Sequence, residues 1–183
     1  MKLAPRNIKI LKGIRVLLTD VDGCLTDSRL FYLPDGRDGM AETKGFSSQD
    51  GMAMRWLMET GIQIGWISGR DSPATVERAR NLGVTYVYQN HLEKLGPYAE
   101  IKEKAGATDA QVCYIGDDLP DTPIMLRAGF AVAPANAASE VKKIAHYVTK
   151  AAGGYGAARE IIELILKAQG KWEPILKKYG LKG

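Results

Sequence analysis

Short apolar runs alternate with helix-length segments along most of this chain, and this alternation restricts its fold more than any other feature. Strands are expected at 15–19, 63–67, 85–88, 112–115 and 130–132. Helices are expected at 51–60, 73–82, 95–105, 122–128 and 139–145. Strands that alternate with helices form a parallel sheet with helices on both faces. The pattern therefore predicts an α/β fold, a Rossmann-like three-layer α/β/α arrangement.

One segment interrupts the alternation. Residues 29–33 and 41–44 flank a turn-rich stretch and predict a β-hairpin that projects after the first strand. An amphipathic helix is expected at 157–168, and the mixed segment 172–183 is expected to be partly ordered or frayed. Four glycines that follow expected helices predict left-handed helix ends: Gly61, Gly83, Gly106 and Gly129.

Composition favours one domain over residues 1–183, with the hairpin at 29–44 and a C-terminal tail at 150–183. The chain has 183 residues, of which 45% are hydrophobic, and this suits a substantial core. It contains no apolar stretch long enough to span a membrane, and because its first residues lack a long apolar run we expect no secretory signal. Cys24 and Cys113 lie beside expected buried strands, so we expect free thiols in a cytoplasmic protein.

The charge balance argues against nucleic acid as a partner. The 25 Lys and Arg exceed the 21 Asp and Glu by a net charge of +4, and much of the excess lies in the tail. A solvated helix face explains such lysines, and the sequence shows no interleaving of basic and aromatic residues. A locally positive site is therefore more consistent with a small anionic substrate than with nucleic acid.

Two aspartates stand at the end of the first expected strand, in the sequence Thr-Asp-Val-Asp-Gly of residues 19–23. Alternate residues of a strand point to the same side, so Asp20 and Asp22 should emerge together at its carboxyl end, where open α/β sheets bind ligands. Like charges this close are costly unless a cation or a shared proton relieves them. A divalent metal would do so and would also hold a phosphate. The alternative is an ordinary acidic turn.

Two other expected strands are followed by side chains that could also bind a phosphate. Ser68 and Arg70 follow the second strand, and a hydroxyl and a guanidinium can both donate to phosphate oxygens. Lys94 follows the third strand and can reach the same end of the sheet, although a lone lysine usually lies on the surface.

An acidic cluster follows the fourth strand, in the sequence Gly-Asp-Asp-Leu-Pro-Asp of residues 116–121. Oxygen-rich sites of this kind suit Mg²⁺, which keeps several waters and takes few carboxylates. A solvated turn is the alternative, in which Asp121 caps the next helix. The sequence leaves the roles of Asp118 and Asp121 open.

Together these residues resemble the four motifs of the haloacid dehalogenase superfamily of phosphatases. Residues 20–23, 67–70 and 116–121 are similar to its first, second and fourth motifs, and Lys94 to its third. The segment between Asp27 and Ser68 is too short for the cap domain that many relatives carry. Residues 153–160, Gly-Gly-Tyr-Gly-Ala-Ala-Arg-Glu, resemble a signature of the capless subfamily that contains 3-deoxy-D-manno-octulosonate 8-phosphate phosphatase. The alternative for them is a glycine turn that begins a helix.

The resemblance implies a two-step phosphoryl transfer. By analogy with the family, Asp20 of this chain would be the nucleophile, and Asp22 would donate and then accept a proton. The cofactor would be Mg²⁺, held by the Asp20 carboxylate, the Asp22 backbone carbonyl and Asp117. Ser68 and Lys94 would complete the phosphate site.

The resemblance also implies contacts to a small phosphorylated sugar acid. Beside Asp22 and Lys94, the implied residues are Ser47, Ser48, Gln49, Asp50, Gly51, Arg55, Arg70 and Arg78. Each of the arginines has the alternative of an ordinary surface charge. The sequence departs from the family pattern at Gln49, where arginine is usual, and at Asn90, where glycine is usual. Both departures leave the exact sugar open.

The implied setting is lipopolysaccharide biosynthesis in the cytoplasm, in a homotetramer joined through its hairpins, with residues 150–160 reaching a neighbouring copy. Three alternatives remain open. A phosphatase for a nonulosonate 9-phosphate is favoured by Gln49 and disfavoured by the glycine-rich signature. A non-catalytic regulatory relative is disfavoured because Asp20, Asp22, Lys94 and Asp117 are all present. A nucleic-acid module would depend on the basic tail.

Overall fold

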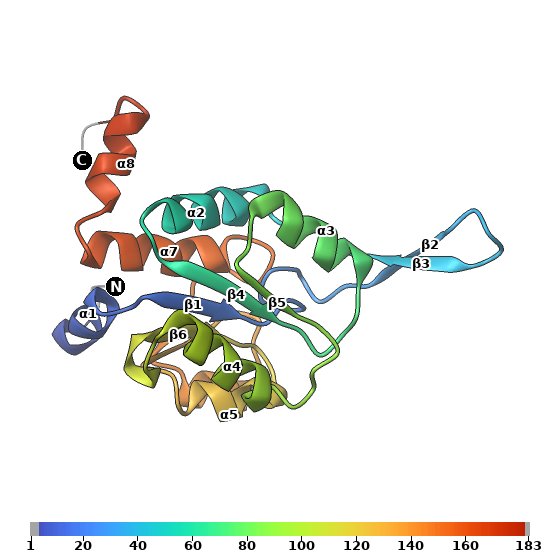
Figure 1. Ribbon diagram of the computed structural model, residues 1–183, viewed down its shortest axis with the longest axis horizontal. Helices are drawn as coiled ribbons and strands as arrows, with labels where there is room; N and C mark the ends of the chain where they lie inside the picture. Colours follow the sequence, from blue (N-terminus) through green and yellow to red (C-terminus); the bar gives the residue numbers. More distant parts are fainter. Residues whose placement is uncertain (1–3, 182–183) are drawn as a thin grey trace.

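The computed structural model describes residues 4–181 and arranges them around one six-stranded parallel sheet (Figure 1). Its strands lie in the order β5-β4-β1-β6-β7-β8. They are β1 (Val16–Thr19), β4 (Gln63–Ile67), β5 (Tyr86–Tyr88), β6 (Val112–Ile115), β7 (Phe130–Ala133) and β8 (Tyr147–Val148). Because β1 lies between β4 and β6, the strand order reverses beside it, and open sheets bind ligands at such a point.

Helices cover both faces of the sheet, as the sequence predicts (Figure 1). Side chains of a strand alternate between faces. Leu17 of β1 therefore packs in the core under one layer of helices, whereas Val16 and Leu18 pack in the core under the other. The first layer is α1 (Pro5–Lys12), α2 (Ser48–Glu59), α3 (Pro73–Leu82) and α7 (Ala157–Ala168). The second layer is α4 (Leu95–Ala105), α5 (Thr122–Met125) and α6 (Ser139–Ile144).

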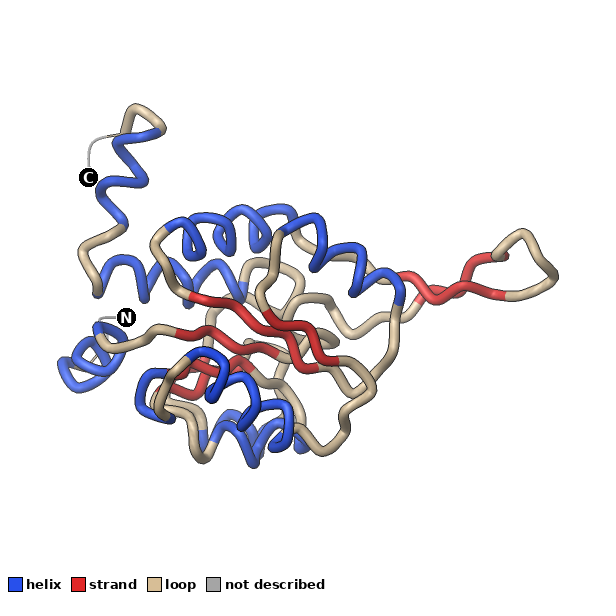
Figure 2. Tube along the Cα trace, viewed as in Figure 1, coloured by secondary structure: helices blue, strands red, loops and turns tan. Residues whose placement is uncertain are grey.

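A two-stranded hairpin projects from the body of the molecule (Figure 2). It pairs β2 (Phe31–Pro34) with β3 (Met40–Thr43) in antiparallel register. Four of its large apolar side chains are between 49% and 61% exposed: Phe31, Tyr32, Leu33 and Met40. Across residues 20–47 the hairpin is the only regular structure, so a cap domain is absent from that described segment.

Most expected elements are confirmed, and where their bounds differ from the expected ones, local contacts set the ends of the helices. Each predicted core strand lies within one residue of its predicted ends. The helix expected at 51–60 begins earlier, at Ser48, because the Ser47 side chain accepts a hydrogen bond from the Asp50 backbone N–H at 3.3 Å. The helix expected at 122–128 ends at Met125. Gly129 is not a left-handed helix end. A side chain there would meet the Ala110 carbonyl oxygen at 2.5 Å.

The sequence analysis did not predict α1, β8 or α8 (Trp172–Lys178). The last of these replaces a segment expected to be mixed or frayed. Its position follows from aromatic packing, because the Trp56 ring of α2 lies 5.6 Å from the Trp172 ring and 5.9 Å from the Tyr179 ring. Residues 182–183 lie outside the described range. None of the described helices is long and apolar enough to cross a bilayer.

The glycine-rich segment before α7 packs against the loop that follows β1. Gly153 donates its backbone N–H to Asn136 Oδ1 at 2.7 Å, and Asn136 Nδ2 donates to the Gly23 carbonyl at 3.0 Å. A Cβ at Gly153 would lie 1.8 Å from that carbonyl oxygen. The signature residue is therefore glycine because two backbone segments meet there.

We expect Gly153→Ala to lower the free energy of unfolding by about 1–3 kcal/mol, since both colliding groups are backbone and must move. The hydrolase activity that the family resemblance implies should fall as well, because the displaced segment contains Asp22 and Gly23. Thermal unfolding and initial rates measure the two effects. Gly96→Ala is the control: its Cβ meets nothing within 4 Å in α4, and it should stabilise by roughly 0.5–1 kcal/mol. An unchanged Gly153→Ala protein would contradict the close approach.

Candidate active site

The loop after β1 and the end of β6 meet at the carboxyl end of the sheet. The Asp20 backbone N–H donates to the Ile115 carbonyl at 2.9 Å, which extends the strand pairing to the first aspartate. Gly23 has a φ of +94°, and a Cβ there would lie 2.0 Å from Asp117 Oδ2. Glycine is therefore needed for this turn and for the approach of Asp117.

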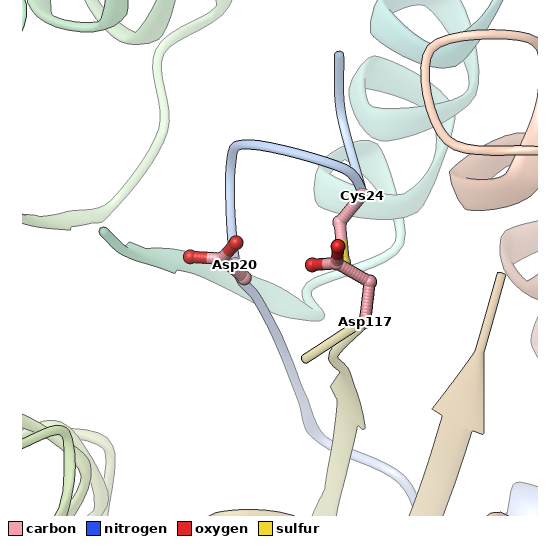
Figure 3. Close-up of side chains that lie close together, drawn as sticks. All are labelled: Asp20, Cys24 and Asp117. Carbon is pink, nitrogen blue, oxygen red and sulfur yellow. The ribbon is translucent and has the colours of Figure 1, made fainter. Parts of the chain in front are cut away.

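Asp20, Cys24 and Asp117 each bring one ligand atom within 4.8 Å of the others (Figure 3). Burial, together with the nearby charges of Asp20 and Asp121, raises the pKa of Asp117 to about 8. Burial also raises the pKa of Asp20 to about 6, although Lys94 opposes that shift. A nearby cation would favour the ionised form of both carboxylates.

The donor set fits a hard divalent cation. Mg²⁺ is bound through one or two carboxylates and keeps several waters, so Asp20 and Asp117 suffice as side-chain ligands. Cys24 Sγ lies 3.5 Å from Asp117 Oδ1. Burial raises the pKa of the Cys24 thiol well above its usual range, so it remains protonated and contributes little to such a site.

Lys94 is buried, contrary to the usual position of a lone lysine, and it joins the first and fourth motifs. Its Nζ donates to Asp20 Oδ1 at 2.6 Å and to Asp121 Oδ1 at 2.7 Å. The two carboxylates raise the pKa of Lys94 against the opposing effect of burial, which keeps it charged. The sequence placed Lys94 at this end of the sheet, and the structure brings it to Asp20.

Asp121 orders the loop rather than the helix after it. Its Oδ1 also accepts from the Tyr114 hydroxyl at 2.7 Å, and its Oδ2 accepts from the backbone N–H groups of Asp117 at 2.9 Å and Asp118 at 3.2 Å. It makes no side-chain cap to α5, so the capping alternative is wrong. Asp118 instead accepts from the Leu119 N–H at 2.8 Å, which caps the short helix Leu119–Asp121.

Asp22 is bound to a lysine that the sequence analysis did not select. Lys44 Nζ donates to Asp22 Oδ1 at 2.7 Å and lies 3.4 Å from Glu42 Oε1. Glu42 Oε2 lies 3.5 Å from Arg70 Nη1. The pattern that could have found Lys44 is its spacing of two from Glu42 on the strand leading back from the hairpin, since such residues share one side.

Asp20, Asp22, Lys94 and Asp117 are among the residues that line a cleft of about 500 Å³. Leu92, which is 72% exposed, also lines a neighbouring depression of about 770 Å³ on the side of α4. The cleft residues outside the motifs found in the sequence are Ser28, Leu30 and Leu92, and Gly69 and Pro120 lie within those motifs but were given no role. The predicted residues that line it are Asp20, Asp22, Arg70, Lys94 and Asp117, together with Asp118 and Asp121.

Ser68 directly follows β4 and is 1% exposed. Its Oγ accepts a hydrogen bond from the Arg70 backbone N–H at 3.1 Å. A hydroxyl that accepts one bond still has its own proton to donate. Ser68 is not among the residues that line the cleft.

The remaining predicted substrate residues gather around the start of α2, outside this cleft. Asp50 is 3% exposed, and its Oδ1 accepts from the Arg159 N–H at 2.7 Å. Arg78 donates to the Ser47 carbonyl at 3.1 Å, and Arg55 donates to the Asn81 carbonyl at 2.9 Å. None of these residues lines the cleft, nor do Ser48, Gln49 and Gly51. Their contact with substrate stays a prediction.

Comparison with known proteins finds consistent similarities. Residues 83–161 match a family model described as haloacid dehalogenase-like hydrolase. The chain is 41% identical over 161 residues to 3-deoxy-D-manno-octulosonate 8-phosphate phosphatase of Yersinia pestis, covering 88% of this chain and 84% of that protein.

Solved structures of phosphatases with related names are similar to this chain as well. The corresponding phosphatase of Moraxella catarrhalis, in complex with magnesium, phosphate and KDO, matches with a TM-score of 0.90 at 34% identity, covering 96% of this chain and 99% of that one. The cobalt-bound deoxy-D-mannose-octulosonate 8-phosphate phosphatase of Haemophilus influenzae matches with a TM-score of 0.86 at 38% identity, covering 93% and 98%.

We expect Asp117→Asn to stabilise the metal-free protein, because it removes a partly buried carboxylate beside the buried carboxylate of Asp20. A gain of about 1 kcal/mol would raise the unfolding midpoint by roughly 2–4 °C. Mg²⁺ should raise the midpoint of the wild-type protein and leave that of Asp117→Asn unchanged. Calorimetry with EDTA or Mg²⁺ measures both shifts, with the exposed Asp118→Asn as control. Equal Mg²⁺ shifts in wild-type and Asp117→Asn would exclude Asp117 as a ligand.

Proposed function

The chain belongs to the haloacid dehalogenase-like hydrolases as a phosphoric monoester hydrolase, and from this membership we propose that it hydrolyses 3-deoxy-D-manno-octulosonate 8-phosphate. The products would be 3-deoxy-D-manno-octulosonate and inorganic phosphate. The observation that carries the proposal is the convergence of Asp20, Asp117 and Lys94 in one cleft. The choice of substrate is supported by relatives at 41% and 38% identity whose names include it.

In the proposed first step, an Asp20 carboxylate oxygen attacks the phosphorus of the ester. The bond between phosphorus and the sugar oxygen breaks, and Asp22 gives its proton to the departing oxygen. An aspartyl-phosphate on Asp20 results. Lys94, held by Asp121 as well as by Asp20, orients the nucleophile and adds a positive charge beside the transferring group.

In the proposed second step, Asp22 takes a proton from water, and the water oxygen attacks the phosphorus. The bond to Asp20 breaks, which releases phosphate and restores both aspartates. Mg²⁺, when bound by Asp20, the Asp22 backbone carbonyl and Asp117, would offset the negative charge of the phosphoryl oxygens. Ser68 would donate its hydroxyl proton to one of those oxygens.

The sugar acid would bind at the open side of the cleft. Arg70 is half exposed there and can form paired hydrogen bonds with a carboxylate. Gln49 in place of an arginine supports a second candidate, a nonulosonate 9-phosphate. The further substrate residues proposed from the family are Ser47, Ser48, Gln49, Asp50, Gly51, Arg55 and Arg78, and a second copy of the chain would have to bring them to a cleft.

Assembly is the proposed way of covering a cleft that has no cap domain. A hairpin with exposed apolar side chains on its own is only marginally stable and gains from pairing. We propose a homotetramer of single-domain chains, joined through residues 29–44, in which residues 150–160 approach a neighbouring copy. The proposed setting is the cytoplasm and lipopolysaccharide biosynthesis, without nucleic-acid or membrane partners.

The substrate proposal is tested by phosphate release with Mg²⁺ over a panel of eight-carbon and nine-carbon sugar-acid phosphates. The eight-carbon ester should have the highest kcat/KM. Asp20→Asn should abolish turnover and keep the fold, since only the nucleophile changes. A higher kcat/KM for a nine-carbon ester would overturn the substrate, and full activity of Asp20→Asn would overturn the mechanism.

The assembly proposal predicts a mass near four times the 20.0 kDa of one chain by light scattering. Leu33→Glu should reduce that mass, because it puts a charge among the exposed apolar side chains of the hairpin. Leu126→Glu is the control, because Leu126 is 71% exposed and lies away from the hairpin. A wild-type monomer with full activity would contradict the tetramer.

A further inference from the structure

Lys44 is a buried lysine that the proposed chemistry does not use. It follows β3 at the base of the hairpin, and its side chain is 0% exposed. Removing an ammonium group from water is costly unless carboxylates compensate for it. Asp22 at 2.7 Å and Glu42 at 3.4 Å provide that compensation. The position of Lys44 is thus fixed by two acidic partners.

The Asp22 carboxylate depends on this contact. Within residues 4–181, no group other than Lys44 Nζ donates a hydrogen bond to it. The Asp22 side chain is 19% exposed and lines the cleft. A carboxylate with a single partner would turn freely if that partner were lost, and a misplacement of about 1 Å can slow a reaction ~100-fold.

We propose that Lys44 is a positioning residue, which holds the Asp22 carboxyl group where it can transfer a proton to and from the phosphate ester. The inference rests on the proposed acid and base role of Asp22. Each aspartate of the first motif then has its own buried lysine partner. Lys94 donates to Asp20, and Lys44 donates to Asp22.

The same contact connects the hairpin with the cleft. Glu42 of β3 touches Lys44 through Oε1 and Arg70 through Oε2, at 3.4 and 3.5 Å. The hairpin base is therefore tied to the loop after β1 and to the loop after β4. A displacement of the hairpin base would reach Asp22 and Arg70 together.

The test compares phosphate esters whose leaving groups differ in their need for a proton. Glycerol 3-phosphate has a basic leaving group, whereas p-nitrophenolate departs with little need of protonation. With Mg²⁺ present, Lys44→Met should lower kcat/KM for glycerol 3-phosphate about 100-fold and for p-nitrophenyl phosphate less than about threefold. Lys44→Arg keeps the charge and should show the same selective loss at about tenfold.

Lys104→Met is the matched control, because Lys104 also pairs with a carboxylate, Glu100 at 2.6 Å, but lies exposed on α4. It should leave both rates unchanged. Equal losses on the two esters, or no loss, in Lys44→Met would overturn the proposal. If Lys44→Met does not fold by circular dichroism, Lys44→Arg decides by the same criterion.

Asp22→Asn separates this inference from the proposed function. It should show the same selective loss, and adding Lys44→Met to it should cost no further activity. Absence of selectivity in Asp22→Asn would overturn the acid and base role itself, and with it the role of Lys44. A failure on octulosonate phosphates in the substrate panel would not affect this result, because simple esters are used here.

Discussion

Negative charge concentrated at one end of a buried sheet is the constraint on which this structure depends. Asp20, Asp117 and Asp121 lie together with little access to water, and isolated carboxylates would be strongly destabilising there. Lys94 and the Tyr114 hydroxyl neutralise or bind part of that charge. The part that remains, between Asp20 and Asp117, is what makes the place suitable for a divalent cation.

The fold concentrates these groups because parallel strands end at the same edge and because glycines let the loops approach. Gly23 admits Asp117, and Gly153 admits the segment before α7 against the Gly23 carbonyl. The first turn of α7 is also fixed to the segment before it, since the Glu160 carboxylate accepts hydrogen bonds from the backbone N–H groups of Lys150 and Ala151. Residues far apart in sequence are thereby held against the loop after β1 by the Asn136 side chain and by backbone contacts.

Much of this could be predicted from the sequence, because it depends on local patterns. Apolar periodicity gave the core strands nearly to the residue, and strand ends located Asp20, Asp22 and Asp117. Lys94 needed the resemblance to a family, because nothing local distinguishes a buried lysine from a surface one. Lys44 and Asn136 were not found, since their roles arise from contacts across more than twenty residues. Helix α8 was missed because its aromatic packing against Trp56 is equally long-range.

The outer strands of the sheet, β5 and β8, are its shortest, with three and two residues. An edge strand exposes unpaired backbone groups that invite pairing with other chains, and brevity is one natural protection against aggregation. The hairpin strands β2 and β3, with four residues each, pair only with one another, so each has a free edge. Growth of the central sheet from copy to copy is thereby discouraged, and within residues 4–181 the hairpin is the β-element that stands clear of the body.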